Sequence, residues 1–539
     1  MAEEIPERDK RSLVDRRRAI ALGAASIGMA SVATPALTKE PARRVQPAPP
    51  LPSPPVASVA PRPPSRPDPI LFWNETALDL DALDHSLDAK EARAPGPCLS
   101  SRALALAHIV MADAVTVSYP DSHEGLYVRG GRGPQGEAAE VFVGAAAARI
   151  LNHIYTTPAH TQLIAIRRQQ FLRAYNSDML TAWNAGLEFG RSEQFTALWD
   201  WRFLKDAALS SYKQVQGAYR GRHDVDPFNT DQKFYGANWS NVPPLLPGLP
   251  IRVFAPRDPP REHERDYARD LEEVRALGAW RPDGPTPDQV KLGLFWAYDG
   301  ARLIGTPPRL YNQIVARIVE SEHMSTPELA RLFALCNIAM ADAAIVCWEA
   351  KYRYQVWRPV LGIRKYAYGP DPYWRPFGAP RTNPPQFALG SDSHRLTALS
   401  MLGGGQQSLE TPTSNILPYK KASFTPNFPA YPSGHATFGS ACFSVLKQVR
   451  GERFPTRQDA GRINVTIVSD ELDGVSIDNF RNVPRPYTPL SYKHIDHMIE
   501  DNNRSRVHLG VHWNFDCESG ASSGRQVADY VYRKAYRLR

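Results

Sequence analysis

Residues 431–438 (Tyr-Pro-Ser-Gly-His-Ala-Thr-Phe) form a motif whose residue types and order can bind an anion. Ser433 stands where a helix N-cap is expected, ahead of an apolar run, and Gly434 lets the backbone approach a ligand closely. The first free N–H groups of the following helix would then face the anion, with His435 beside it. An ordinary capped helix start has the same pattern, so this motif alone leaves both interpretations open.

Two further clusters favour the anion site. Lys351 and Arg358 are seven residues apart, about two helical turns, which predicts that they share one helix face. Downstream, Arg506 precedes His512 and Asp516. If this segment is helical, the last two form an i,i+4 pair in which the carboxylate holds one ring nitrogen and leaves the other aimed at a ligand. Together the three clusters predict a pocket for a highly charged oxyanion.

The order and spacing of these residues resemble the signature of a known superfamily. The motifs are Lys-x6-Arg-Pro at 351–359, Pro-Ser-Gly-His at 432–435 and Ser-Arg-x5-His-x3-Asp at 505–516. They are similar to the three-part signature of the vanadium-dependent haloperoxidases and the type 2 phosphatidic acid phosphatases. The surrounding residues resemble the haloperoxidase branch, notably Trp348 and Leu-Gly-Val-His-Trp at 509–513.

This resemblance implies a cofactor and a role for each motif residue. The cofactor is vanadate, with no haem and no flavin, and His512 is bonded to the metal. The residues that bind the vanadate oxygens are Lys351, Arg358, Ser433, the Gly434 N–H and Arg506. His435 is the acid–base group when hydrogen peroxide binds, for which a reference pKa near neutrality is suited. Asp299 resembles the carboxylate that pairs with the arginine of the third motif, and Asp516 supports His512.

The resemblance also implies the reaction. Halide is oxidised by peroxide to hypohalous acid, which halogenates small organic acceptors, and the metal does not change its oxidation state. Trp348 and Phe428 stand where chloride-oxidising members place apolar aromatic residues, so we expect them to form the halide site. The alternative is a soluble acid phosphatase of the same superfamily, with His512 as the nucleophile that forms a phosphohistidine and His435 as the acid. A non-catalytic binding module fits only the first half of the chain.

The chain from residue 70 onward has the apolar spacing of helices. Residues 105–114 match residues 334–343 at an offset of 229, with seven of ten identical. We therefore predict an all-α fold of two related helical bundles, 70–286 and 287–539, each with its own core. Only the second is expected to carry a site, because the lysine of the first motif corresponds to Ser122 in the first half.

Several residues near the motifs have simpler interpretations. Arg353 is expected on a solvated helix face. His508 and His512 have the spacing of a zinc pair, but the glutamate of a metalloprotease motif and a third ligand are both missing. Asp342 is expected to be a core helix residue, since its counterpart Asp113 lies in the half without a site.

The connection at 220–286 is rich in proline, arginine and aspartate, and we expect an irregular segment with short helices there. The intervals 360–427 and 436–504 are longer than the family resemblance leads us to expect. We predict that both intervals lie at the rim of the pocket.

The N-terminal segments differ in composition from the rest. Residues 1–36 contain Asp-Arg-Arg-Arg at 15–18 followed by an Ala/Gly-rich apolar run, which resembles a twin-arginine export signal and predicts a periplasmic or extracellular protein. An uncleaved anchor helix is the alternative. Residues 37–69 hold twelve prolines and are expected to be a disordered linker.

Charge and cysteine content exclude several other functions. Residues 1–69 contain 11 Lys/Arg and 7 Asp/Glu, so half of the formal net charge of +8 belongs to the signal and linker. No basic block interleaved with aromatics follows, and nucleic acid is not an expected partner. The mature chain is expected to lack an integral membrane segment. Five cysteines without Cys-x2-Cys spacing are expected to be buried free thiols: Cys98, Cys336, Cys347, Cys442 and Cys517.

Overall fold

The computed structural model describes most of the chain after the first 65 residues. The described residues are 66–88, 90–175, 179–210, 221–227, 234–280, 284–366, 369–380, 423–454, 456–476 and 484–539. The predicted signal, most of the predicted linker and most of the 360–427 interval lie outside them. Asp68 and Pro69, at the end of the predicted linker, are the N-cap and first residue of α2.

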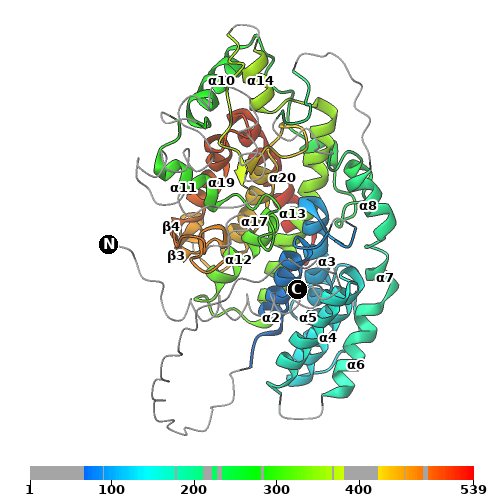
Figure 1. Ribbon diagram of the computed structural model, residues 1–539. Coiled ribbons are helices and arrows are strands. Elements are labelled where there is room, and N and C mark those ends of the chain that lie inside the picture. The colour runs from blue at the N-terminus through cyan, green and yellow to red at the C-terminus, as the bar shows by residue number, and fades with distance from the viewer. Residues whose placement is uncertain are drawn as a thin grey trace, which may run out of the picture.

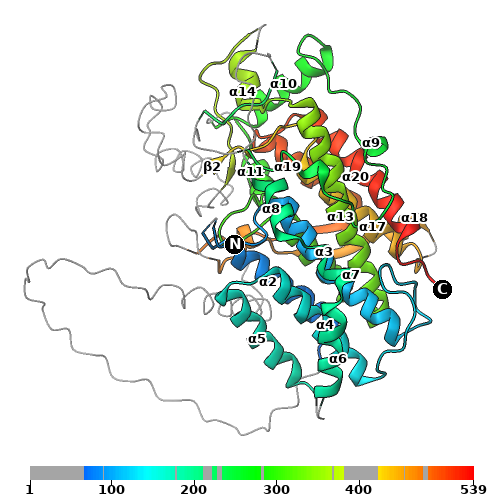
Figure 2. The same ribbon diagram turned by 90° about the vertical axis from the view of Figure 1, so that its right-hand side faces the viewer.

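The first half is a bundle of helices, drawn in blue to teal in Figures 1 and 2. Its elements are α2 (Pro69–Asp84), α3 (Gly96–Ser118), α4 (Glu137–Ile154), α5 (Pro158–Leu172), α6 (Leu180–Arg191), α7 (Glu193–Thr196) and α8 (Trp201–Leu209). Within the described residues, the connection that follows contains two short elements, as predicted, η1 (Trp239–Asn241) and α9 (Ile251–Phe254), together with a longer helix of 13 residues, α10 (Arg265–Leu277).

The second half is also mostly helical. Its helices are α11 (Pro287–Phe295), α12 (Pro307–Val319), α13 (Thr326–Tyr354), α14 (Pro359–Lys365), α17 (Gly434–Arg450), α18 (Arg457–Gly461), η5 (Asp470–Leu472), α19 (Ile495–His508) and α20 (Asn514–Lys534). Two small antiparallel pairs accompany them: β1 (Ala379–Pro380) with β2 (Ser423–Phe424), and β3 (Arg462–Ile467) with β4 (Leu490–His494). The predicted all-α class is confirmed.

Local sequence explains where the helices of the second half begin. Thr286 and Gln289 form a capping box at α11, and Ser325 and Glu328 form one at α13. In each box two otherwise unpaired N–H groups of the first turn find acceptors. Ser433 is the N-cap of α17, and its hydroxyl accepts from the Ala436 N–H at 3.5 Å.

The two helices that carry the sequence repeat, α3 and α13, pack against each other, as Figure 2 also shows. Both are long and apolar enough to cross a membrane by composition, yet the apolar stretch of each is fully buried inside the protein. The buried apolar side chains of both halves form one continuous cluster. The expectation of a separate core for each bundle is therefore wrong, because the repeated helices bury their apolar faces on each other.

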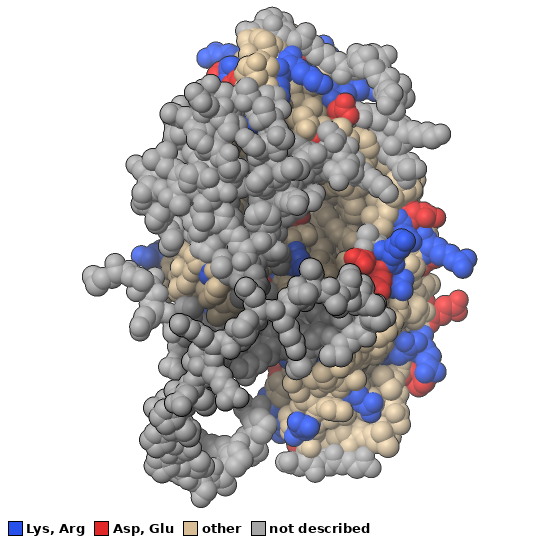
Figure 3. Space-filling view, in the orientation of Figure 1, with Lys and Arg blue, Asp and Glu red and all other residues tan. Residues whose placement is uncertain are grey.

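All five cysteines are buried and free, as predicted. On the face seen in Figure 3, charged side chains of both signs are interspersed over the described surface. This distribution agrees with a solvated surface rather than a basic patch.

Candidate active site

Lys351 lies in the last turn of α13 and is fully buried. Its Nζ donates to the carbonyl oxygens of Pro429 (2.8 Å), Ala430 (3.1 Å) and Pro432 (2.5 Å). Burial lowers the pKa of this ammonium group to about 7. Because all three of its N–H donors are taken, Lys351 acts here mainly as a positive charge behind the Pro-Ser-Gly-His turn.

Arg358 does not share a helix face with Lys351, contrary to the prediction. Helix α13 ends at Tyr354 with the left-handed residue Gln355 (φ 54°), and Arg358 is the N-cap of α14. The two side chains nevertheless reach one region, since both cations lie 5.0 Å from the Phe428 ring. Arg358 donates to the carbonyls of Phe428 (Nε, 2.9 Å) and Val511 (Nη1, 2.8 Å), and its buried Nη2 has no partner within the described residues. Burial lowers its pKa.

Arg506, in the last turn of α19, is paired with Asp299, as the family resemblance implies. Its Nη2 lies 2.9 Å and 3.0 Å from the two carboxylate oxygens. Its Nε and Nη1 are buried and have no partner in the part of the chain that the structure describes. Burial raises the pKa of Asp299, and the charge of Arg506 opposes this shift.

His512 and Asp516 are in contact, although not as an i,i+4 pair within one helix. His512 precedes α20, and Asp516 lies in its first turn, where Oδ2 accepts from the Trp513 N–H (3.0 Å) and contacts His512 Nδ1 (2.9 Å). His512 Nε2 lies 2.9 Å from Arg358 Nη1. A guanidinium group only donates, so Nε2 carries the lone pair and Nδ1–H donates to Asp516. Burial, reinforced by Arg358, lowers the pKa of His512 well below its ordinary value.

His435 follows directly on the cap of α17. Its Nε2 lies 2.6 Å from the Ala297 carbonyl oxygen and 4.0 Å from Asp299 Oδ1. Because a carbonyl only accepts, Nε2 carries the hydrogen and Nδ1 keeps its lone pair. Burial, with a further contribution from Arg506, lowers the pKa of His435 well below its ordinary value. A Cβ on Gly434 would lie 3.3 Å from the Trp348 ring, so this glycine lets the helix start pack against that side chain.

An aromatic wall borders the site. The Trp348 and Phe428 rings have centroids 4.9 Å apart, and the Phe428 ring lies 5.0 Å from both Lys351 Nζ and Arg358 Cζ. A cavity of about 110 Å³ lies in front of this wall. The predicted site residues that line it are Asp299, Trp348, Phe428, Gly434, His435 and His512.

Sequence reasoning missed several residues that line this cavity. They are Gly96, Tyr235, Tyr298 and Thr306. Tyr235 comes from the irregular connection, and its ring centroid lies 6.3 Å from that of Phe428, so it extends the aromatic wall. The Phe-Trp-Ala-Tyr-Asp-Gly run around Asp299 was the one sequence signal, and it covers only Tyr298.

The residues given simpler interpretations stay outside the cavity. His508 is buried and not among its lining residues, and burial lowers its pKa to about 4. Within the described residues no group of three His, Cys, Asp or Glu side chains is placed to hold a metal ion, which removes the zinc alternative there. Asp342 is a fully buried helix residue that accepts from the Leu245 and Leu246 N–H groups.

The donor set fits a tetrahedral oxyanion. Three buried guanidinium nitrogens lack hydrogen-bond acceptors in the described structure: Arg358 Nη2, Arg506 Nε and Arg506 Nη1. Burying such N–H donors without acceptors is costly in free energy. An anion among them supplies the missing acceptors. His512 Nε2 is a neutral nitrogen that here accepts from Arg358 Nη1, and it would bind the central atom once an anion accepts that N–H in its place.

Comparisons with known proteins agree with this geometry. Residues 66–226 match the family model of the vanadium chloroperoxidase N-terminal domain, and residues 331–539 match that of the second helical-bundle domain. The vanadium chloroperoxidase of Curvularia inaequalis is 30% identical over 531 residues, covering 83% of this chain and 78% of that protein.

Solved structures share the fold. The first bacterial vanadium-dependent iodoperoxidase matches with a TM-score of 0.58 at 16% identity, covering 86% of this chain and 96% of that one. A holo-type bacterial vanadium-dependent chloroperoxidase matches with a TM-score of 0.55 at 14% identity, covering 84% and 94%. The chain belongs to the vanadium chloroperoxidase family of vanadium haloperoxidases.

Proposed function

We propose that this protein is a vanadate-dependent haloperoxidase that uses hydrogen peroxide to oxidise chloride or bromide to hypohalous acid, which halogenates small organic acceptors. The observation that supports the proposal is that three buried guanidinium nitrogens, on Arg358 and Arg506, lack partners within the described residues, while the charges of both arginines act on His512. His512 Nε2 lies 2.9 Å from Arg358 Nη1. Vanadate, when bound, supplies a Lewis-acidic centre that activates peroxide without changing its own oxidation state.

The residues of the site bind the oxyanion in different ways. Arg358 and Arg506 donate to the oxyanion, Lys351 contributes its charge from behind the turn, and the Ser433 hydroxyl and Gly434 N–H lie at the start of α17, where the helix dipole favours an anion. His512 ligates through Nε2 because Asp516 holds its Nδ1–H and fixes both ring orientation and tautomer.

His435 is the acid–base group of the proposed reaction. Its Nε2–H is held by the Ala297 carbonyl, so only Nδ1 is available to take a proton from peroxide and return it. The ring is neutral in the anion-free protein, because burial and the nearby arginines disfavour its charged form. Trp348 and Phe428 keep water away from the cavity and provide the apolar surface that a halide meets.

Reconstitution tests this proposal. Metal-free protein is titrated with orthovanadate while peroxide-dependent halogenation of an enol acceptor is followed. We expect activity to rise with vanadate and saturate, and His512→Ala to lose activity by at least about 100-fold and to bind vanadate more weakly. Full activity of His512→Ala would refute the assignment.

The phosphatase alternative predicts a different result in the same preparation. Phosphate and vanadate are both tetrahedral, so we expect phosphate to slow reconstitution and the metal-free protein to hydrolyse aryl phosphates only slowly. Fast turnover of physiological phosphate esters, without peroxide-dependent halogenation, would make the protein a phosphatase.

We also propose that residues 1–36 direct export as a folded protein to the periplasm or beyond. The support is the Arg-Arg pair at 16–17 ahead of the apolar run. A reporter fused to residues 1–36 should be exported, and the Arg16→Lys/Arg17→Lys double variant should not be. Export of the double variant would contradict a twin-arginine route.

A further inference from the structure

The loop at 297–306, which joins α11 to α12, carries two groups of the site. Asp299 pairs with Arg506, and the Ala297 carbonyl fixes the ring of His435. Four of its residues have positive φ angles: Tyr298 (41°), Gly300 (82°), Leu303 (60°) and Gly305 (81°). Non-glycine residues in this region persist only when the surroundings hold them. Where the loop is anchored therefore matters for the site.

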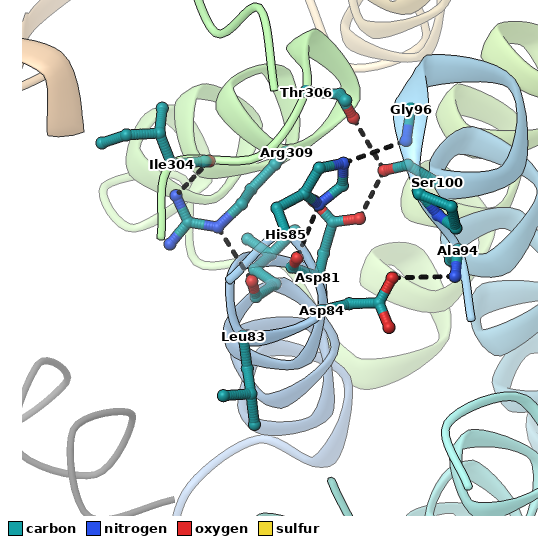
Figure 4. A network of polar contacts seen from close by, with 12 residues as sticks. Asp81, Leu83, Asp84, His85, Ala94, Gly96, Ser100, Ile304, Thr306 and Arg309 are labelled. Atoms are coloured by element: carbon teal, nitrogen blue, oxygen red, sulfur yellow. Dashed lines mark hydrogen bonds and ion pairs between the residues drawn. The ribbon is translucent and has the colours of Figure 1, made fainter. Parts of the chain in front are cut away.

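One anchor comes from the N-terminal bundle through a chain of hydroxyl groups. The Thr306 hydroxyl donates to Ser100 Oγ on α3 (2.8 Å), and Ser100 donates to Asp81 Oδ1 on α2 (2.5 Å). All three residues are buried, and Figure 4 shows the chain running from the loop to α2. Gly305 packs on the same carboxylate, because an added Cβ would lie 2.6 Å from Asp81 Oδ2.

A second anchor is Arg309, near the start of α12. Its Nη1 donates to the Ile304 carbonyl of the loop (3.2 Å), as Figure 4 also shows. Its Nε donates to the Leu78 carbonyl of α2 (2.8 Å). Nη1 also pairs with Asp470, whose N–H donates to the Tyr298 hydroxyl at 2.9 Å. Arg309 thus ties the loop to α2 on one side and to the 436–504 interval on the other.

Asp81, Ser100 and Arg309 do not line the described cavity, whereas Thr306 does. The side chains of Ser100 and Arg309 hydrogen-bond to the loop, and Asp81 holds Ser100, so these three residues contact the loop or its anchor and not the cavity. The loop in turn places Asp299 and the Ala297 carbonyl. A displacement of the loop would change both the orientation of Arg506 and the hydrogen bond that sets the tautomer of His435.

We propose that Asp81, Ser100, Thr306 and Arg309 are positioning residues, through which the bundle without an anion site orients Arg506 and His435 in the other bundle. The effect on turnover rests on the function proposed above, whereas the effect on anion affinity does not. The competing explanation is that this network only stabilises the fold.

Asp113 provides a matched control. It is a fully buried carboxylate on α3 that also holds a loop, accepting from the Leu126, Tyr127 and Val128 N–H groups at 2.8–2.9 Å. None of these residues lines the cavity. Asp113→Asn therefore perturbs a buried carboxylate and its loop without touching the 297–306 loop.

The test uses the full-length chain and measures vanadate affinity by calorimetry on metal-free protein, thermal stability, and steady-state kinetics at saturating vanadate. Ser100→Ala and Thr306→Val should each weaken vanadate binding by about 10-fold and lower kcat more than they change KM for peroxide. Thr306→Ser, which keeps the donor, should recover most of the affinity lost in Thr306→Val. Asp113→Asn should lose stability but keep wild-type affinity and kcat.

The result that overturns the inference is wild-type vanadate affinity in Ser100→Ala and Thr306→Val, together with a loss of stability like that of Asp113→Asn. Ser100→Ala carries the comparison, because Ser100 does not line the cavity and Thr306 does. If Ser100→Ala fails to fold, Ser100→Thr, which keeps the hydroxyl, and Ser100→Cys are compared in its place. If the wild-type protein binds vanadate without oxidising halide, the proposed function fails, and the affinities still decide whether the network positions the site.

Discussion

Helices α3 and α13 carry the same ten-residue motif and use it in the same way. Asp113 on α3 holds the backbone of residues 126–128, and Asp342 on α13 holds that of residues 245–246. Both carboxylates are fully buried, and burial raises the pKa of each. The repeated sequence therefore has a structural role: in each helix a buried carboxylate holds the backbone of a loop.

The two helices differ where the repeat ends. Helix α3 stops at Ser118, which corresponds to Cys347 at the offset of 229, whereas α13 continues to Tyr354. This extension carries Trp348 and Lys351, and the counterpart of Lys351 is Ser122, whose hydroxyl bonds to the Tyr119 carbonyl in its own turn. The two helices thus share a structural motif, but only α13 contributes to the candidate site. Its additional one and a half to two turns carry the cation and the aromatic ring.

The largest expected effect is on halide oxidation, and it compares His435, in the candidate site, with His108, a buried histidine of the first bundle. His435→Ala should lower halide oxidation by about 100- to 10,000-fold, because the group that accepts the peroxide proton is gone. Vanadate affinity should change far less, since Lys351, Arg358 and Arg506 remain. Halogenation kinetics and vanadate calorimetry measure the two quantities.

His108 on α3 is the control for that variant. It is buried, and burial lowers its pKa to about 4. His108→Ala should cost stability without lowering kcat. Chloride oxidation by His435→Ala at the wild-type rate would remove His435 from the mechanism.

Lys351 and Ser122 give a pH-dependent comparison. Burial holds the pKa of Lys351 at about 7 in the folded protein, against 10.5 for an exposed lysine. The unfolded chain therefore binds more protons between pH 7 and 10.5, and stability of the anion-free protein rises with pH in that window. Anion affinity has the opposite trend, because the ammonium charge is lost as pH rises through 7.

Sulfate is a suitable probe, since it keeps its charge across this range. Its affinity should fall between pH 6 and 9, by at most about tenfold per pH unit for one proton. Lys351→Met should bind sulfate weakly and with a shallower pH dependence, whereas Ser122→Ala should follow the wild type. Equal slopes in wild type and Lys351→Met would show that another group titrates.

Asp113→Ala and Asp342→Ala test whether the two carboxylates have equivalent roles. Asp342→Ala leaves two buried backbone N–H groups without acceptors, and Asp113→Ala leaves three in half-buried residues, which are less costly each. An unpaired buried group should cost about 1–3 kcal/mol. Urea unfolding should show similar losses for both variants, and vanadate affinity should stay at the wild-type value in both. A selective loss of affinity in Asp342→Ala would mean that its loop also supports the site.

The sequence predicted the parts of this site that depend on local structure. Ser433 as a helix N-cap follows from capping chemistry, and the contact between His512 and Asp516 from their spacing. The helical premise behind that spacing was wrong, because Trp513, between His512 and Asp516, is the extended N-cap of α20. The shared face for Lys351 and Arg358 was wrong because the left-handed residue Gln355 ends α13 between them.

The contribution of Tyr235 to the cavity was not predictable in this way. Tyr235 lies more than a hundred residues from Trp348 in the chain, and the side chains of both meet only through tertiary packing. The Asp81–Ser100–Thr306 chain likewise joins α2, α3 and the 297–306 loop. No local pattern marks such contacts, since any buried hydroxyl or carboxylate can satisfy several partners.

The smallest expected effect concerns halide preference, which has no counterpart in the first bundle. Phe428 presents an apolar ring between Trp348 and the two cations Lys351 and Arg358. Phe428→His places a polar imidazole there, and the neighbouring cations keep it neutral. Water bound to this imidazole should hinder chloride more than bromide, because chloride is the more strongly hydrated ion and depends more on a dry wall. The ratio of chloride to bromide kcat/KM should therefore fall by about three- to tenfold. Phe428→Leu keeps the wall apolar and should retain the wild-type ratio. An unchanged ratio in Phe428→His would mean that halide preference is set elsewhere, with the 360–427 interval as the next segment to vary.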